Sequence, residues 1–417
     1  MLAGAFARIP ESSFRVHAGD FSRTGPLSPE FLTVFLLYMV ADSNTRGIRH
    51  LVPDFWNEAV DHGLPLPCET PVTPSAICQA RQKLNSDLLR DLLSEIAWGA
   101  PGGQELGDRY WRGRRVLAVD GAKVNLRKHP DLAWAFGVPE GAYCPQVLLS
   151  LMVDACTRMP MDLQVSGYAT SERDHLFRML ESLQAGDILL LDRGYPSHEV
   201  LQELAGSNID YVVRVPASHT FKVVDEFRES GAQDAMYILD VPKDADAGWK
   251  PLLVRLVRVE GPDGPAFYIT SMSPANLSIQ DIAELYHLRW QAEEAFKLFT
   301  SEYIGQGQFR STSPSGVIQE FHALALFLAI ARVLACVAEE QLPDKAQFPS
   351  QKGAVLTLAN FLTRILLDPD PRRVVGHLER AITRILRTRD LHRPDRSYPR
   401  RSFRPQRKWG PSGRRGA

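Results

Sequence analysis

The chain has 417 residues, of which 44% are hydrophobic and 23% are charged. A chain of this length can bury a large core and exceeds the usual size of one domain, so we expect two or three domains. The formal net charge is −1, but the charges are segregated. Residues 380–417 hold twelve arginines and Lys408 against Asp390 and Asp395, a net charge of +11 that leaves −12 for the rest. Such a basic end is attracted to polyanions, although a solvated end that only aids solubility is an equally open interpretation.

Cysteine spacing and apolar stretches exclude two further classes. The five cysteines form no CxxC pair, which argues against a zinc site, and their odd number without a secretory leader predicts a reducing compartment. Phe31–Ala41 is too short to span a membrane, and Phe321–Cys336 is interrupted by His322 and Arg332. Both are predicted to be buried helices of a soluble protein with no membrane partner.

The first region, residues 1–107, is predicted to be a helical DNA-binding or assembly domain. Apolar residues recur at helical spacing in two blocks between residues 27 and 107, which a Pro- and Gly-rich connection separates. Such a pair of blocks can present a helix to a DNA groove, but helical packing units without a DNA role are at least as common.

The second region, residues 108–345, changes to short apolar runs. Three strands, then a helix, a strand, a helix and a strand give the order β-β-β-α-β-α-β, which predicts an α/β fold with a mixed sheet and helices on both faces. Residues 216–276 alternate more strictly and predict a β-rich antiparallel insertion. A helical pattern resumes at about Ser278. The third region, residues 346–417, is expected to be helical and to end in a disordered basic tail over 388–417.

Two aspartates end predicted strands of the sheet. Asp120 ends "VLAVD" and Asp192 ends "ILLLD". One such aspartate means little, because Asp is frequent where a strand meets a turn. Two that meet in a crevice at adjacent strand ends repel each other, and a divalent cation relieves that repulsion. The pair therefore predicts a metal site.

The helix after the insertion carries the third acid. One narrow stripe of this helix holds Tyr286, Arg289, Glu293 and Lys297. Glu293 would complete the ligand set, while Arg289 and Lys297 could hold DNA phosphates. An ordinary amphipathic helix would explain Glu293 with Lys297, but it would not explain the two aspartates that precede it.

These segments resemble a known family. "YHLRWQAEEAFKLF" is similar to the Y-x2-R-x3-E signature of DDE transposases from bacterial insertion sequences, in the branch called after insertion element four, and "VLAVDGAKV", "LLLDRGYPS" and "DFSRTGPLSPEFL" extend the likeness over roughly residues 15–340. The resemblance implies an RNase H-like catalytic domain in which Asp120, Asp192 and Glu293 are the catalytic, metal-binding triad. It assigns Tyr286 and Arg289 to DNA contacts. The signature's final lysine is replaced by Thr300, and Lys297, one turn earlier on the same face, is the expected substitute.

The expected activity is cleavage of element ends and joining of the 3′-OH to target DNA, with two Mg²⁺ or Mn²⁺ ions as cofactors. Further phosphate contacts are predicted for Arg193 and Arg310, and the basic tail would add salt-sensitive attraction to DNA. The expected partners are double-stranded DNA, as element ends and target, and a second copy of the chain in a homodimer formed on DNA. The expected location is the cytoplasm, in association with the nucleoid.

Three alternatives stay open. They are a metal-dependent nuclease without strand transfer, a DNA-binding remnant or repressor that has lost catalysis, and an unrelated hydrolase with paired carboxylates. Two residues near the site are assigned ordinary roles. Glu172, near the start of a helix, is expected to stabilise the helix dipole, and Trp290 is expected to be buried beside its helix.

Overall fold

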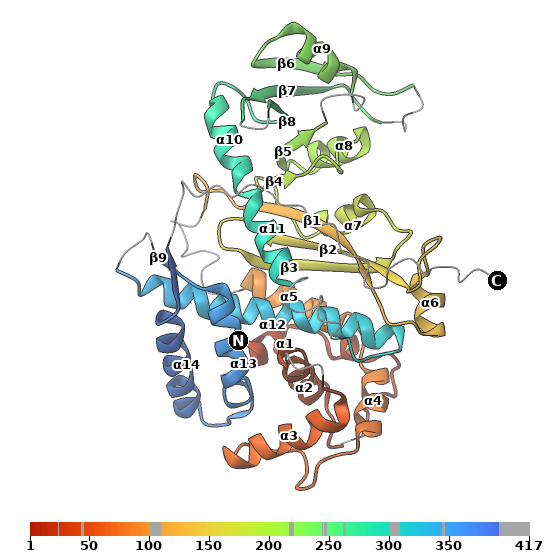
Figure 1. Ribbon diagram of the computed structural model, residues 1–417, viewed down its shortest axis with the longest axis vertical. Helices are drawn as coiled ribbons and strands as arrows, with labels where there is room; N and C mark the ends of the chain where they lie inside the picture. The colour runs from red at the N-terminus through yellow and green to blue at the C-terminus, as the bar shows by residue number, and fades with distance from the viewer. Residues whose placement is uncertain are drawn as a thin grey trace, which may run out of the picture.

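The computed structural model describes residues 1–23, 25–42, 46–99, 110–216, 221–243, 245, 248–261, 264–299, 309–343 and 347–391. Within these described residues, one eight-stranded sheet stands above a group of packed helices (Figure 1). The strands are β1 (Val116–Asn125), β2 (Gln146–Asp154), β3 (Met159–Gly167), β4 (Ile188–Leu191), β5 (Asp210–Val215), β6 (Asp234–Leu239), β7 (Leu252–Val259) and β8 (Ala266–Thr270).

The sheet is mixed, as the sequence predicts. Its strand order is β3-β2-β1-β4-β5-β8-β7-β6, with β1, β4 and β5 parallel and the other neighbours antiparallel. All four residues of β4 are buried, as expected of a central parallel strand that is covered on both faces. This α/β architecture, three antiparallel strands followed by two parallel ones, is RNase H-like.

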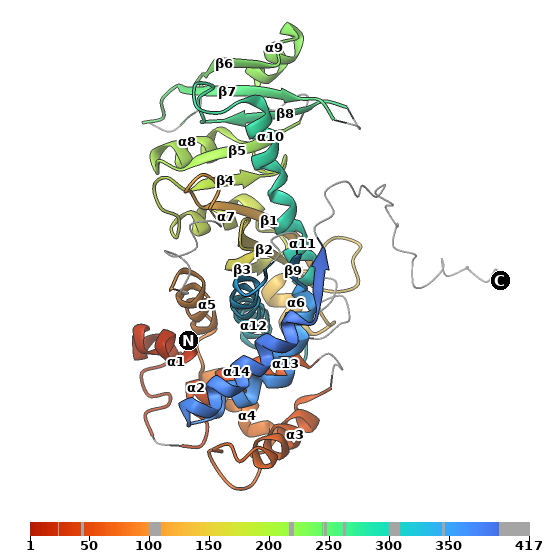
Figure 2. The same ribbon diagram turned by 90° about the vertical axis from the view of Figure 1, so that its left-hand side faces the viewer.

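Helices cover both faces of the sheet, which confirms the predicted layers. Figure 2 shows α10 (Ile279–His287) and α11 (Arg289–Lys297) on one side, and α7 (Glu172–Leu180) and α8 (His198–Gly206) on the other. α11 packs on β1 and β2, while α7 packs on β2 and β3. The carboxyl ends of β1 and β4 therefore lie between the two layers of helices.

The predicted element order omits one helix. α6 (Pro130–Phe136) lies between β1 and β2. It has seven residues and buries only Leu132 and Phe136, so it is too short to show a helical period in the sequence.

The segment 216–276 extends the main sheet. β8 pairs with β5, and β7 and β6 follow it, so these antiparallel strands continue the sheet beyond the parallel ones. The segment also contains α9 (Lys222–Ser230), which packs on β6. The buried Arg255 on β7 binds Asp234 through two hydrogen bonds of 2.7 Å and anchors the last strand pair.

The helices below the sheet come from both ends of the chain. They are α1 (Leu2–Arg8), the 3₁₀ helix η1 (Glu11–Phe14), α2 (Pro29–Ala41), α3 (Ile48–Asp61), α4 (Pro74–Lys83), α5 (Leu88–Gly99), α12 (Pro314–Glu340), α13 (Gln351–Leu367) and α14 (Pro371–Leu386). β9 (Gln347–Pro349) and β10 (Arg389–Leu391) form a separate two-stranded sheet. α12 packs on α2, α5, α13, α14 and β3, so it joins the N-terminal and C-terminal helices to each other and to the sheet.

α12 is also the one described helix that is long and apolar enough to cross a membrane, with a mean hydropathy of 2.2. Its apolar stretch is 94% buried inside the molecule. Both stretches expected to be buried helices, Phe31–Ala41 and Phe321–Cys336, lie within α2 and α12 and are largely buried. The boundaries of the three predicted domains stay a prediction.

Candidate functional site

Asp120 lies within β1, and Asp192 directly follows the neighbouring parallel strand β4. The register of β1 against β4 pairs Val116 with Ile188 and Ala118 with Leu190, a constant offset of 72 residues. The same offset separates Asp120 from Asp192, so the two aspartates stand at one level where β4 ends. Neighbouring strands lie about 4.8 Å apart, and residues at one level point to the same face of a sheet. The sheet thus brings two carboxylates together just beyond the end of β4. β1 continues to Asn125, so Asp120 lies within its strand and does not end it as the sequence predicts.

Glu293 reaches this crevice from α11. The predicted single helix from Ser278 is divided at Leu288 into α10 and α11, which corrects the uninterrupted stripe expected from the sequence. At this point Leu288 N donates to Leu285 O at 3.1 Å, and Gln291 N donates to Leu288 O at 2.9 Å. Both hydrogen bonds join residues three apart and not four, so the chain forms a tighter, 3₁₀-like turn here. The side chains of Arg289 and Glu293 form an ion pair along α11.

The charges of the crevice act on one another. Burial, opposed by Arg289 and by the Gly121 N–H but reinforced by Glu293 and Glu172, raises the pKa of Asp120 to about 6. Although burial acts in the opposite direction, Tyr286, Glu293 and Asp192 raise the pKa of Arg289. The three predicted acids therefore share one electrostatic environment, with the Arg289 guanidinium among them.

Glu172 is a fourth carboxylate in this crevice, and its sequence-based assignment to the helix dipole missed that position. Burial and the nearby Asp192, opposed by Lys123 and the Tyr195 hydroxyl, raise the pKa of Glu172. The sequence signal for its location is a pair of glycines, Gly121 and Gly194, which closely follow the two aspartates. Their missing side chains leave the space that the Glu172 carboxylate occupies.

The donor set suits a hard divalent cation, which takes oxygen ligands. Asp192 Oδ1 is buried and has no hydrogen-bond partner among the described residues. A buried carboxylate oxygen without a donor is costly, and a bound cation would satisfy it. The described part of the chain nevertheless contains no three Asp, Glu, His or Cys side chains already arranged as a ligand set. Glu293 is turned to Arg289, so the expected convergence of three acids is only partly present.

The other residues predicted at the site occupy different environments. Tyr286 is buried, with its ring 4.6 Å from that of Tyr268 and 5.5 Å from the Arg289 guanidinium carbon. Lys297 is exposed, and its Nζ is 4.0 Å from Glu294. Arg193, next to Asp192, is exposed. Of these three residues, only Tyr286 belongs to the buried wall of the crevice.

Arg310 is not brought to the site. Its guanidinium is buried between α2 and α12, where Nη2 is 3.0 Å from Asp42 and Nε donates to the Arg46 carbonyl at 2.7 Å. A side chain held in this way connects helices and does not present its charge to DNA. The structural role of Arg310 replaces the phosphate contact expected from the sequence.

Trp290 departs from its expected burial. Its side chain is 42% exposed on α11, one residue after Arg289. Two further sequence-based interpretations, on Thr300 and on most of the basic tail over 388–417, fall outside the described residues.

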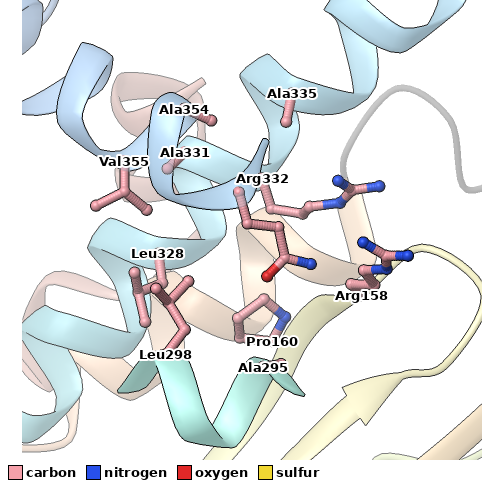
Figure 3. Close-up of a pocket in the computed structure, with 11 residues that line it drawn as sticks. Arg158, Pro160, Ala295, Leu298, Leu328, Ala331, Arg332, Ala335, Ala354 and Val355 are labelled. Carbon is pink, nitrogen blue, oxygen red and sulfur yellow. The ribbon is translucent and has the colours of Figure 1, made fainter. Parts of the chain in front are cut away.

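A separate pocket lies behind the helix that carries Glu293 (Figure 3). Ala295 of α11 and Leu298, which caps that helix, line it together with α12, α13 and the start of β3. These two residues are about 200° and 140° around the helix from Glu293, so the pocket opens on the opposite side of α11. Arg158 and Arg332 line it as well, and none of the four acids does. It is therefore not part of the carboxylate crevice.

Comparison with known proteins identifies the family to which this fold and this group of acids belong. A family model described as the transposase DDE domain matches residues 111–330, which is more than half of the chain. The chain belongs to this family of DDE transposases. In particular, it is similar to the transposase InsG for insertion sequence element IS4 of Escherichia coli strain K12, with 24% identity over 307 residues, 69% of this chain and 67% of that protein. The predicted family, a DNA transposase of the insertion-element-four type, is confirmed.

A solved structure also aligns with the chain. It is the piggyBac transposase synaptic complex with hairpin DNA. The alignment covers 92% of this chain and 80% of the piggyBac chain, with 13% identity and a TM-score of 0.42.

Proposed function

We propose that this transposase cleaves the ends of a DNA element and joins the freed 3′-OH to target DNA, with Asp120, Asp192 and Glu293 as the acids that hold two divalent cations, Mg²⁺ or Mn²⁺. The observation that supports this proposal is the register of β1 and β4, which aligns the two aspartates and leaves Asp192 Oδ1 buried without a donor. When bound, such cations would supply a Lewis acid for the phosphodiester and lower the pKa of an attacking water or hydroxyl.

The chain's own groups would position the reactants. Asp120 within β1 and Asp192 directly after β4 would keep a constant separation, because the hydrogen-bonded strands hold both backbones in register. Glu293 lies on α11, which begins directly after the tightened turn at Leu288, and the Arg289 guanidinium restrains its carboxylate. Release of Glu293 from Arg289 would let the acid face the aspartates and free the arginine for a phosphate oxygen.

DNA contacts are proposed for the exposed cations next to these acids. Arg193 follows Asp192 directly, and Lys297 lies one turn beyond Glu293. Tyr286 is buried, so we propose that it shapes the crevice wall beside Arg289 and takes no direct part in DNA binding. The basic end of the chain would add attraction that weakens with salt, and a homodimer assembled on DNA would hold the two element ends.

The test uses the element's own flanking DNA with Mg²⁺ and follows the strand products on a sequencing gel. Asp120→Asn, Asp192→Asn and Glu293→Gln are each expected to lower cleavage by at least about a thousandfold, because a two-metal site loses a ligand. DNA binding, measured by gel shift, should stay within about threefold of wild type. Substantial Mg²⁺-dependent nicking by any of the three variants contradicts the assignment.

A second substrate separates transposition from simple nuclease activity. Pre-cut element ends with a free 3′-OH should be joined to a supercoiled target by the wild-type protein. Cleavage of intact ends without joining of pre-cut ends would identify a nuclease that lacks strand transfer.

A further inference from the structure

We propose that Glu172 is a fourth carboxylate ligand of the catalytic crevice, where it holds one divalent cation together with Asp120 and Asp192. This inference rests on the proposed function, since it adds a residue to the same metal site. It assigns Glu172 a role that neither the sequence pattern nor the family's acidic triad gives it.

The position of Glu172 is defined by two glycines. A Cβ atom built on Gly121 would lie 2.9 Å from both Cδ and Oε1 of Glu172, and 3.0 Å from its Cγ. A Cβ built on Gly194 would lie 3.9 Å from Oε2. Gly121 follows Asp120 directly, and Gly194 comes two residues after Asp192. The two oxygens of Glu172 thus face the chain just beyond each aspartate.

Glu172 enters the crevice from an independent element. It is the first residue of α7, which packs on the face of the sheet opposite α11. Successive residues of a strand point to opposite faces, so Asp120 faces α11 while the hydrogen atoms of Gly121 face Glu172. Asp120 and Glu172 therefore approach the middle of β1 from opposite faces, at the level where the neighbouring strand β4 ends.

Unsatisfied groups surround this carboxylate. Asp192 Oδ1 is buried and has no partner among the described residues. Its charge acts directly on Glu172. Tyr195 is 2% exposed, and its hydroxyl also has no partner among the described residues. A phenol carries no positive charge, so it cannot supply the charge that these acids lack.

The ordinary role of an acid at a helix start is already filled. Ser171 caps α7, and Asp174 completes the capping box by accepting from the Ser171 N–H at 3.0 Å. Glu172 is not needed for that purpose. Glu199 offers a matched comparison, because it lies in the first turn of α8 behind the cap Ser197 but is exposed. Helix-dipole stabilisation predicts the same behaviour for both glutamates, whereas a metal ligand predicts different behaviour.

The first experiment measures Mn²⁺ binding to the full chain by electron paramagnetic resonance, with thermal unfolding as a check on folding. Glu172→Gln should raise the Kd for Mn²⁺ at least tenfold, as should Asp120→Asn and Asp192→Asn, while Glu199→Gln should leave it unchanged. Equal Kd values for Glu172→Gln and Glu199→Gln, with binding lost in the two aspartate variants, would overturn the role of Glu172 and leave the proposed function intact. Unchanged Mn²⁺ binding in Asp120→Asn and Asp192→Asn would instead overturn the proposed function.

A double-mutant cycle tests the contact itself. Gly121→Ala introduces the Cβ that displaces the Glu172 carboxylate, so it should weaken Mn²⁺ binding as Glu172→Gln does. Glu172→Ala removes the atoms that this Cβ would meet. In the Glu172→Ala background, Gly121→Ala should therefore change the Kd by less than about twofold. An equal loss of affinity in both backgrounds would show that Gly121 acts through Asp120 or β1, and it would overturn the proposed coordination.

Discussion

Buried charges occur in two regions of the molecule and are balanced differently. Between α4 and α12, Glu320 is 1% exposed and Arg81 is 5% exposed, with Arg81 Nη2 3.3 Å from Glu320 Oε1. The remaining Glu320 oxygen accepts from the Arg310 N–H at 2.8 Å, and Arg81 also donates to the Gly316 carbonyl at 2.9 Å. Every charge in this ion-pair cluster has an opposite charge or a hydrogen bond beside it.

The carboxylate crevice is balanced less completely. Arg289 pairs with Glu293, and Lys123 acts on Glu172, but Asp192 Oδ1 is buried and has no hydrogen-bond partner among the described residues. Acids that are crowded without enough cations cost free energy in the folded protein. Paired charges between α4 and α12 therefore stabilise the fold, whereas the excess of negative charge in the crevice costs stability, and this cost is what the proposed cations would offset.

The largest effect expected from this comparison is in the ion-pair cluster. Glu320→Gln removes the charge that Arg81 needs and leaves a buried cation uncompensated, so the free energy of unfolding should fall by about 3 kcal/mol. Denaturation in urea measures this change, with the exposed Glu199→Gln as control. A loss below about 1 kcal/mol would mean that the cluster tolerates imbalance and that the contrast with the crevice is not real.

A smaller and opposite effect is expected when cations fill the crevice. A ligand that binds only the folded state at a hundred times its Kd stabilises it by about 2.7 kcal/mol. Mn²⁺ should therefore raise the thermal midpoint of the wild-type protein and of Glu320→Gln by similar amounts. Asp192→Asn should lose this response. Equal Mn²⁺ stabilisation of wild type and Asp192→Asn would place the cation elsewhere on the surface.

The sequence indicated those parts of the site that depend on local pattern. Two apolar runs that each lead into an Asp predict the paired aspartates, and the register of β1 against β4 has the same offset as these two residues. That β1 continues beyond Asp120 was not predicted. The third acid, Glu293, could be predicted from its helical spacing from Tyr286 and Arg289. The mixed sheet followed from the order of strands and helices, because few sheet topologies accommodate that order.

The remaining features depend on distant contacts. Arg310 binds Asp42, 268 residues away, and nothing near Arg310 in the sequence indicates this partner. Glu172 has the same local pattern as Glu199, an acid behind a serine cap, and only the fold places one in the crevice and the other in solvent. The tightened turn at Leu288 contains no Pro or Gly that would mark it.

The smallest effect concerns Asp120 in the absence of metal. The pKa of this carboxyl is raised to about 6 in the folded protein, above its unfolded value near 4, so the unfolded state releases its proton first as pH increases. The folded state therefore loses stability between about pH 4 and pH 6 and carries the full penalty at pH 7. Asp120→Asn removes that penalty, and we expect it to stabilise the metal-free protein by about 1–2 kcal/mol at pH 7, after allowance for partial solvent screening.

The sign of this effect distinguishes the two regions more sharply than its size. Neutralising an acid should destabilise the ion-pair cluster but stabilise the crevice, although both acids are at least partly buried and both changes replace a carboxylate with an amide. Urea denaturation in EDTA at pH 7 and pH 5 measures it, and the gain from Asp120→Asn should shrink at pH 5 because the wild-type carboxyl is then largely protonated. A loss of stability at both pH values would show that Asp120 is held by partners within the chain, and its availability to a cation would then no longer follow from its surroundings.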